Sequence, residues 1–263
     1  MVAMQRARGE ARVAIGRRGL VDLRQSGSAK AMLPRTDGPD PEVVFLNTAG
    51  GVTGGDRLDY ALTVGAGARV TASTQTAERA YRAAGGTGVV QTSLTVGPDA
   101  RLDWLPQEAI LFEGSRTRRE TRATLGPGAT LLMADAVVLG RAAMGEAVRR
   151  AVFDDLRAVH GADGRPLHLD HLALDADALA DADALGGARA LATLVLLGPG
   201  AADRLGGLRA VLPAFGAASA WDGRLVARLA HAEAAPLRRA LIRAIVALRG
   251  RPVPRVWQAE AAP

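Results

Sequence analysis

The sequence contains no cysteine, and this absence excludes disulfide bonds, thiolate metal sites and cysteine nucleophiles. It fits a reducing compartment. We expect the protein to be cytoplasmic, because the sequence shows neither a signal peptide nor a membrane-spanning run. Aromatic residues make up only 3% of the chain, so its core must rely on Val, Leu and Ala. No apolar run approaches the ~18 residues that a membrane-spanning helix needs, and the first residues lack the apolar core of a signal peptide. We expect no membrane contact.

Lysine is nearly absent as well, because Lys30 is the only one and arginines carry the net charge of +6. This basic balance has two interpretations, a compositional bias toward arginine or an acidic partner. The arginines are scattered along the chain, no nucleic-acid-binding motif is recognisable, and few aromatics are available to stack on bases. We therefore expect no nucleic-acid partner.

What is present is typical of a soluble globular protein. The 263 residues are 48% hydrophobic and 23% charged, with 31 glycines and 13 prolines that imply many turns. A chain of this length and type favours one domain. We expect a single domain over residues 1–263, with residues 1–10 frayed.

Residues 61–133 show a weak internal repeat, in which an alternating strand is followed by Gly-x-x-Ala and a second apolar strand. The repeated glycines, Gly65, Gly97 and Gly126, lie 32 and 29 residues apart. Such a unit predicts stacked strand–turn–strand hairpins that share one core. Because the repeat is irregular, we expect a mainly β, helically wound and stacked architecture that is similar to a β-sandwich. About two α-helices are expected near the C-terminus, the stronger over residues 236–248.

The densest glycine segment lies between two predicted strands. It contains four glycines and ends in a carboxylate: Gly50, Gly51, Gly54, Gly55 and Asp56. Glycine permits positive φ and close backbone approach. The segment is not a Walker A loop, because no Lys-Ser/Thr follows the last glycine, and it is not a dinucleotide fingerprint, because a strand follows it. Two interpretations stay open, a structural corner and a functional loop that presents Asp56.

Two of the four histidines lie close together, in the segment His168-Leu169-Asp170-His171. If this segment is a strand, His168 and Asp170 share one face and His171 points away. At most two ligands then lie together, fewer than a metal site usually has. These residues are either ordinary strand residues or part of a weak, transient site with imidazole and carboxylate ligands.

The remaining candidate chemistry rests on carboxylates, since no Gly-x-Ser-x-Gly motif is present. Glu108, Glu113 and Asp135 could supply a catalytic pair, although cross-strand pairing cannot be read from the sequence. Asp135 interrupts the apolar run 131–139, where an unpaired ionised acid would cost several kcal/mol. It needs either a functional reason or an arginine partner such as Arg141.

Residues 47–56 resemble the Gly-Gly-x-x-Gly-Gly-Asp signature of the UreD (UreH) urease accessory proteins. The resemblance continues in the family's order and spacing over roughly residues 11–258. The matching segments are 25–27, 74–76, 81–82, 104–108, 111–114, 139–141, 145–146 and 254–257. Together they make the resemblance specific, although no single one would.

The resemblance implies a mostly β, helically wound fold and a scaffold that is not itself an enzyme. It implies that the protein binds the urease apoprotein with UreF and UreG. It also implies that the protein assists the insertion of nickel, with a carbamylated lysine, into the urease active site. We expect no tightly bound cofactor, only transient nickel. A homodimer formed through the UreD–UreF complex is a further expectation.

The family is proposed to contain a passage lined by polar and acidic groups. The acids in the matching motifs are Asp56, Glu108 and Glu113. Asp135 and Asp170 lie outside these motifs, and we add them on the local patterns described above. Nickel accepts nitrogen and oxygen ligands when thiolates are absent, so acids and water could hold it weakly. His168 and His171 belong to no pattern recognised in the family.

Two alternatives stand beside this hypothesis. The first is an all-β enzyme in which Asp56 and a second acid form a catalytic pair. The second is a plain protein-interaction module without metal handling. A deep pocket with two acids within about 5–10 Å of each other would favour the enzyme, and a diffuse polar lining would count against it. Neutralising Asp56, Asp135 and Asp170 would separate the plain module from a nickel-delivery protein.

Overall fold

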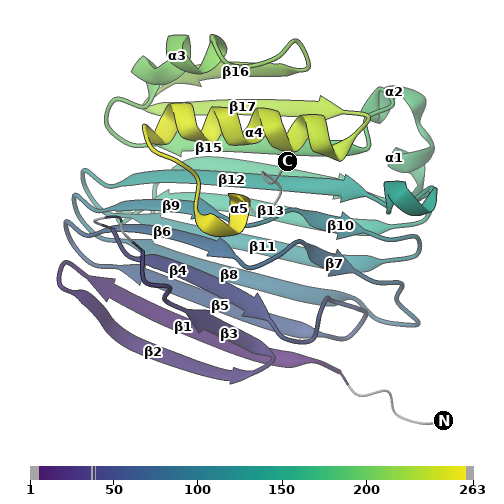
Figure 1. Cartoon of the computed structure of the whole chain (residues 1–263), viewed down its shortest axis with the longest axis horizontal. Coiled ribbons are helices and arrows are strands. Elements are labelled where there is room, and N and C mark those ends of the chain that lie inside the picture. The colour runs from purple at the N-terminus through teal and green to yellow at the C-terminus, as the bar shows by residue number, and fades with distance from the viewer. Residues whose placement is uncertain (1–5, 37, 39, 259–263) are drawn as a thin grey trace.

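The computed structural model describes residues 6–36, 38 and 40–258, and it shows two β-sheets that face each other (Figure 1). One sheet has seven strands and the other has ten. The predicted fold class, mainly β with helically wound and stacked sheets, is confirmed.

The strand bounds are as follows. The first sheet contains β1 (Arg8–Gly16), β2 (Gly19–Gly27), β5 (Arg57–Val64), β8 (Gly88–Val96), β11 (Arg116–Leu125), β13 (Val152–Gly161) and β14 (Pro166–Leu174). The second contains β3 (Ala29–Met32), β4 (Glu42–Asn47), β6 (Arg69–Thr74), β7 (Glu78–Ala80), β9 (Arg101–Leu105), β10 (Ala109–Leu111), β12 (Thr130–Leu139), β15 (Ala190–Leu197), β16 (Gly216–Trp221) and β17 (Arg224–His231).

The chain winds from one sheet to the other along the repeat. Strands β5, β8, β11 and β13 are parallel neighbours in the first sheet, and β6, β9 and β12 are parallel neighbours in the second. The prediction of hairpins is therefore wrong, because the two strands of each repeat lie in different sheets. A strand–turn–strand pattern reads the same for a hairpin and for an arch between two sheets, so sequence alone could not separate them.

The repeated glycines are explained by the stacking of the turns between successive coils. A Cβ atom at Gly97 would lie 2.8 Å from the backbone N of Ala66, and one at Gly126 would lie 2.6 Å from that of Pro98. Each turn therefore touches the turn of the preceding coil too closely for a side chain. The interval between the repeated glycines is therefore the length of one coil, that is, one passage of the chain through both sheets.

The core follows the alternation of the strands. On β5 the core-facing residues are at most 6% exposed: Leu58, Tyr60, Leu62 and Val64. Phe45 on β4 packs its ring 5.2 Å from that of Tyr60, across the space between the sheets. Burial of such side chains is the main source of the fold's stability.

One long helix, α4 (Ala234–Arg249), packs on the outer face of the second sheet, against β15 and β17 (Figure 1). The helix predicted over residues 236–248 is confirmed, and its apolar stripe is buried: Leu237, Leu241, Ile245 and Leu248. Gly250 ends the helix with a φ of 68°, a left-handed conformation that glycine adopts without strain. Four short helices also form: α1 (Ala176–Ala180), α2 (Ala182–Leu185), α3 (Leu205–Arg209) and α5 (Arg255–Gln258).

The two ends of the described chain are held by the sheets. Strand β1 starts at Arg8, which pairs with Arg57 of β5, so the prediction that residues 8–10 are frayed is wrong. Residues 1–5 lie outside the described residues. At the other end Trp257 is 2% exposed, and its Nε1 donates a hydrogen bond of 2.9 Å to the carbonyl of Leu105. None of the described helices is long and apolar enough to cross a membrane.

Candidate functional site

A cavity of about 60 Å³ lies between the two sheets. It has room for a few water molecules, since one water needs roughly 10–15 Å³ of such space. Its polar lining comes from both sheets and includes Glu78, Thr117, Arg119, Asp135 and Arg157. The hydroxyl oxygen of Thr117 has no hydrogen-bond partner among the described residues. The cavity is therefore suited to hold water rather than to stay empty.

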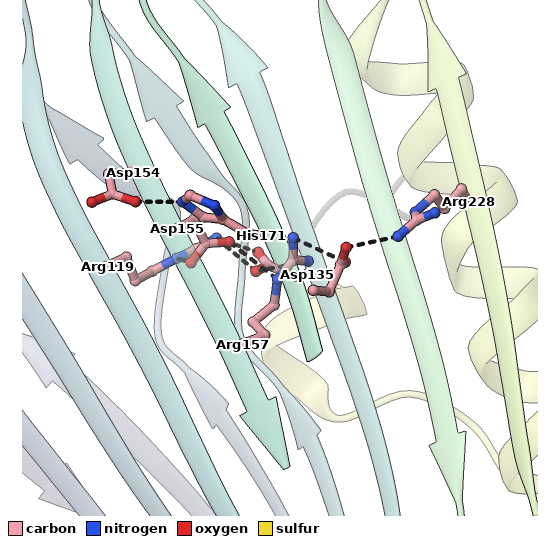
Figure 2. Close-up of polar contacts among 8 residues, drawn as sticks. Arg119, Asp135, Asp154, Asp155, Arg157, His171 and Arg228 are labelled. Carbon is pink, nitrogen blue, oxygen red and sulfur yellow. Dashed lines mark hydrogen bonds and ion pairs between the residues drawn. The ribbon is translucent and has the colours of Figure 1, made fainter. Parts of the chain in front are cut away.

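Arg119, on the inner face of β11, is the centre of a buried ion network (Figure 2). Its Nη2 lies 2.7 and 2.6 Å from the two carboxylate oxygens of Asp135 on β12. Its Nε lies 2.8 Å from Oδ1 of Asp155 on β13, and Nη2 also lies 2.9 Å from Oδ2. One guanidinium thus bridges two buried carboxylates that belong to different sheets.

A second arginine, Arg157, extends the network toward solvent. It is 4% exposed, and its Nη1 lies 3.4 Å from Asp135 Oδ2. Its Nη2 lies 3.2 Å from Asp170 Oδ2, and Arg228 Nη2 lies 2.7 Å from the other oxygen of Asp170. A chain of alternating charges therefore runs from the interior to the exposed side chain of Arg228 (Figure 2).

The charges of this network balance, with three arginines (Arg119, Arg157 and Arg228) against three aspartates (Asp135, Asp155 and Asp170). Burial raises the pKa of Asp135 to about 6, although Arg119 opposes this rise. Burial also acts to raise the pKa of Asp155, but Arg119 and Arg157 together oppose it and the net shift is downward. We therefore expect the first proton taken up by this pair to reside mainly on Asp135.

Arg157 separates the cavity from an open cleft of about 710 Å³ between β14 and the second sheet. The cleft is lined by Asp170 and Arg228 and by apolar side chains that include Leu191 and Phe215. Arg157 lines both spaces. An ion that passes from the cavity to the cleft would have to displace the guanidinium of Arg157, or water would have to solvate it.

Glu78, at the start of β7, is a further acid of the cavity and was missed in the sequence. Its Oε1 accepts a hydrogen bond of 3.1 Å from Asn47 Nδ2, which also donates one of 2.9 Å to the carbonyl of Gly51. Burial raises the pKa of Glu78 to about 7, against the opposing effects of Asn47 and Arg119. This carboxyl can therefore change its charge near neutral pH.

The glycine corner that contains Asp56 is shaped by close packing. A Cβ atom at Gly51 would lie 2.4 Å from the ring of Tyr81, and Gly55 has a φ of 91°. The Asp56 carboxylate accepts hydrogen bonds from the backbone N–H of Ala7, at 2.8 Å, and of Thr53, at 2.9 Å. These contacts fasten the start of β1 to the corner. Asp56 does not line the cavity.

The predicted acids Glu108 and Glu113 lie apart from each other and from the network. Glu108 Oε2 lies 2.7 Å from Nη1 of Arg238 on α4, on the outer side of the second sheet. Glu113 accepts hydrogen bonds from the backbone N–H groups of Arg149 and Arg150, and these bonds lower its pKa to about 2. Of the five predicted acids, the structure brings only Asp135 and Asp170 into one network.

The histidines of β14 point in the predicted directions. His168 is buried, and burial lowers its pKa, so it is neutral near pH 7. Its Nε2 has no hydrogen-bond partner among the described residues. His171 lies on the opposite face, with Nε2 2.7 Å from Asp154 Oδ1. The two rings are therefore on different sides of the sheet.

The arginine partners of Asp135 were not identified from the sequence, and the suggested Arg141 is wrong. Arg141 instead pairs with Glu146 at 2.8 Å. A usable signal was present, because alternation places Arg119 on the same face of its strand as the buried Ala123 and Leu125. An arginine on a core face needs an acid, and Asp135 is an acid on a core face.

Comparison with known sequences places the chain in one class of protein, the urease accessory proteins. Curated relatives named "Urease accessory protein UreD" come from Cereibacter sphaeroides, Dinoroseobacter shibae and Paracoccus denitrificans. The first is 56% identical over 97% of this chain and 96% of the relative. The second is 52% identical over 97% and 93%, and the third 51% identical over 98% and 94%. The family described as "UreD urease accessory protein" matches residues 5–258. The chain belongs to the UreD family.

Proposed function

We propose that the protein is a non-enzymatic scaffold that assists the insertion of nickel into urease in the cytoplasm. In this role it binds apo-urease together with UreF and UreG. Membership of the UreD family over residues 5–258 supports a role in urease maturation. The observation that supports nickel handling is the polar cavity between the sheets, which the charged network connects to the open cleft.

The acids of the network suit transient rather than tight binding of a cation. Asp135 is held by Arg119 and Arg157, so an incoming Ni²⁺ would compete with two guanidinium groups for its oxygens. Carboxylates and water are acceptable nickel ligands when thiolates are absent. A site with this competition binds weakly, which suits a protein that hands its cargo to another.

The proposed route enters the cavity beside Glu78, passes Asp135 and leaves at Asp170 in the cleft. Arg157 is the barrier between the last two acids. Asp56, Glu108 and Glu113 were also predicted to act in nickel passage, but their contacts with backbone N–H groups and arginines suit structural or docking roles better. His168, in the interior, is a candidate for weak assistance, whereas His171 faces outward.

The test uses cells that express urease and its other accessory proteins but lack this one. We expect them to make urease without nickel, and wild-type protein to restore its nickel content. Asp135→Asn and Asp170→Asn should reduce the nickel content of purified urease severalfold. Asp154→Asn is the matched control, because Asp154 lies on the outer face with its side chain 46% exposed.

Co-purification with UreF and apo-urease shows whether each variant still assembles. Full nickel content in urease from cells without the protein would refute the proposal. Normal nickel delivery by assembled Asp135→Asn and Asp170→Asn variants would favour a plain interaction module. That alternative has its own support, since the predicted acids already have protein partners.

A further inference from the structure

Strand β2 forms an edge of the first sheet, and no other strand of the described residues pairs with its outer side. It has nine residues, and all of them after Gly19 are exposed. The other sheet ends are shorter or better protected: β3 has four residues, β14 starts with Pro166, and β16 contacts α3. A long edge strand offers unpaired backbone N–H and C=O groups to another strand. Edge strands of this kind pair readily with a second chain.

The side chains of β2 are unusual for a surface in contact with water alone. Leu20, Val21 and Leu23 are 52%, 72% and 37% exposed. Asp22 and Arg24 flank Leu23, and neither forms an ion pair within the part of the chain that the structure describes. The charges and apolar groups of this strand are therefore free to engage a partner.

Arg24 also lies in an unfavourable position within one copy. It is directly opposite Arg12 on β1, whose charge is only partly offset by its ion pair with the partly exposed Glu10. Like charges at directly opposed positions of an antiparallel pair destabilise the sheet. An acidic residue on the open side of β2 would offset this repulsion.

We infer that β2 pairs in antiparallel fashion with β2 of a second copy, about a two-fold axis through Leu23. In this register Asp22 of each copy faces Arg24 of the other, so two opposite-charge pairs form. Leu23 faces its own counterpart, and Val21 faces Gln25. A two-fold interface must be complementary to itself, and opposite charges placed symmetrically about an apolar residue meet that requirement.

Several features favour a second copy over a segment of another protein. The two charges adjacent to Leu23 have opposite signs, and the exposed apolar residues lie at or near the axis. The pairing joins two seven-stranded sheets into one continuous sheet. It is a direct contact between two copies, and it differs from a dimer assembled through UreF.

The absence of cysteine permits a direct test of the register. Leu23→Cys introduces a single thiol next to the axis, where facing Cβ atoms of an antiparallel pair are about 4.5–5.5 Å apart, close to disulfide distance. Under mild oxidation we expect the full-length variant to form a disulfide-linked dimer at least tenfold faster than Leu169→Cys. Leu169 is the matched control, because it is 69% exposed on the opposite edge strand, β14. Equal cross-linking rates for the two variants would overturn the inference.

Charge reversal tests the same register without a covalent bond. Asp22→Arg or Arg24→Asp alone turns both ion pairs into like-charge pairs, and we expect each to raise the dimer dissociation constant about tenfold. The double variant Asp22→Arg/Arg24→Asp should restore it, because the pairs re-form with exchanged signs. Sedimentation velocity over a range of concentrations measures the constant.

The control for this experiment is Asp203→Arg/Arg204→Asp with its single variants, which makes the same charge changes at two exposed residues. These residues directly precede α3, which lies at the opposite end of the molecule from β2 (Figure 1). These variants should dimerise like wild type. A wild-type protein that stays monomeric at all concentrations, or a double variant that fails to recover, would overturn the inference. Reduced binding of another protein without any change in self-association would assign β2 to a foreign strand instead.

Discussion

Replacing Arg119 by methionine should destabilise the fold far more than replacing an exposed arginine of the same strand. The substitution removes the cation that contacts Asp135 at 2.6 Å and Asp155 at 2.8 Å. Breaking a buried pair costs about 3–5 kcal/mol, because a charge is left uncompensated. Arg157 remains 3.4 Å from Asp135 and 3.3 Å from Asp155, so we expect a loss near the lower value, about 3 kcal/mol.

For a domain of this size, that loss lowers the melting temperature by roughly 6–12 °C. The deficit should also depend on pH. Without Arg119 the folded-state pKa of Asp135, which is already raised, rises further, and that of Asp155 rises from its lowered value. The penalty is therefore complete at pH 8 and is relieved as the pH falls and both acids take up protons. Urea unfolding of Arg119→Met and wild type at pH 5 and pH 8 measures both effects.

The neighbouring Arg118 provides the control for this prediction. Its side chain is 59% exposed and lies 3.8 Å from Asp154, so Arg118→Met should cost less than about 1 kcal/mol. The double variant Arg119→Met/Asp155→Leu removes one charge of each sign, and it should regain part of the lost stability. Equal stability of Arg119→Met and Arg118→Met at pH 8 would refute the view that the buried network is coupled.

Three further predictions concern single sites. Burial raises the folded-state pKa of Glu78 to about 7, so the wild type loses stability as the pH rises from about 4.5 to 7. The loss amounts to up to about 3 kcal/mol. Glu78→Gln should abolish it, as measured by urea unfolding at several pH values. Gly51→Ala, whose Cβ would lie 2.4 Å from the Tyr81 ring, should cost about 1–3 kcal/mol, whereas Gly85→Ala, with open space around it, should cost less than about 1 kcal/mol. Leu241→Ala, which truncates a side chain that is 1% exposed under α4, should cost about 2–5 kcal/mol in the same assay.

Much of the fold could be predicted from local patterns. The alternation on β5 and the stripe of α4 each place apolar residues on one face, and burial then determines how each element packs. The repeated glycines correctly indicated a stacked repeat. They could not indicate in which sheet the next strand lies, because that choice depends on contacts between turns 29 or 32 residues apart in sequence, such as Gly126 with Pro98.

The site was harder to predict than the fold. Asp135 was recognised as anomalous because its own strand is apolar, a property that can be read locally. Its partners lie on β11 and β13, which belong to the facing sheet, so only the stacking of the sheets determines the pairing. Glu78 was missed for a related reason. Its segment looks polar and irregular, and the burial that raises its pKa comes from distant residues.

The energetics of buried charge favour a functional reason for this interior. Apolar side chains of similar volume often replace a buried ion network with no loss of stability, so stability alone does not explain six charged residues in this network. In the proposed nickel role, Asp135 and Asp170 would bind a cation only after an arginine moves. Glu78 forms no ion pair within the described residues and can lose its proton near neutral pH. A cation that enters the cavity would therefore exchange first with that proton, and the arginines would limit how long it stays at the acids beyond.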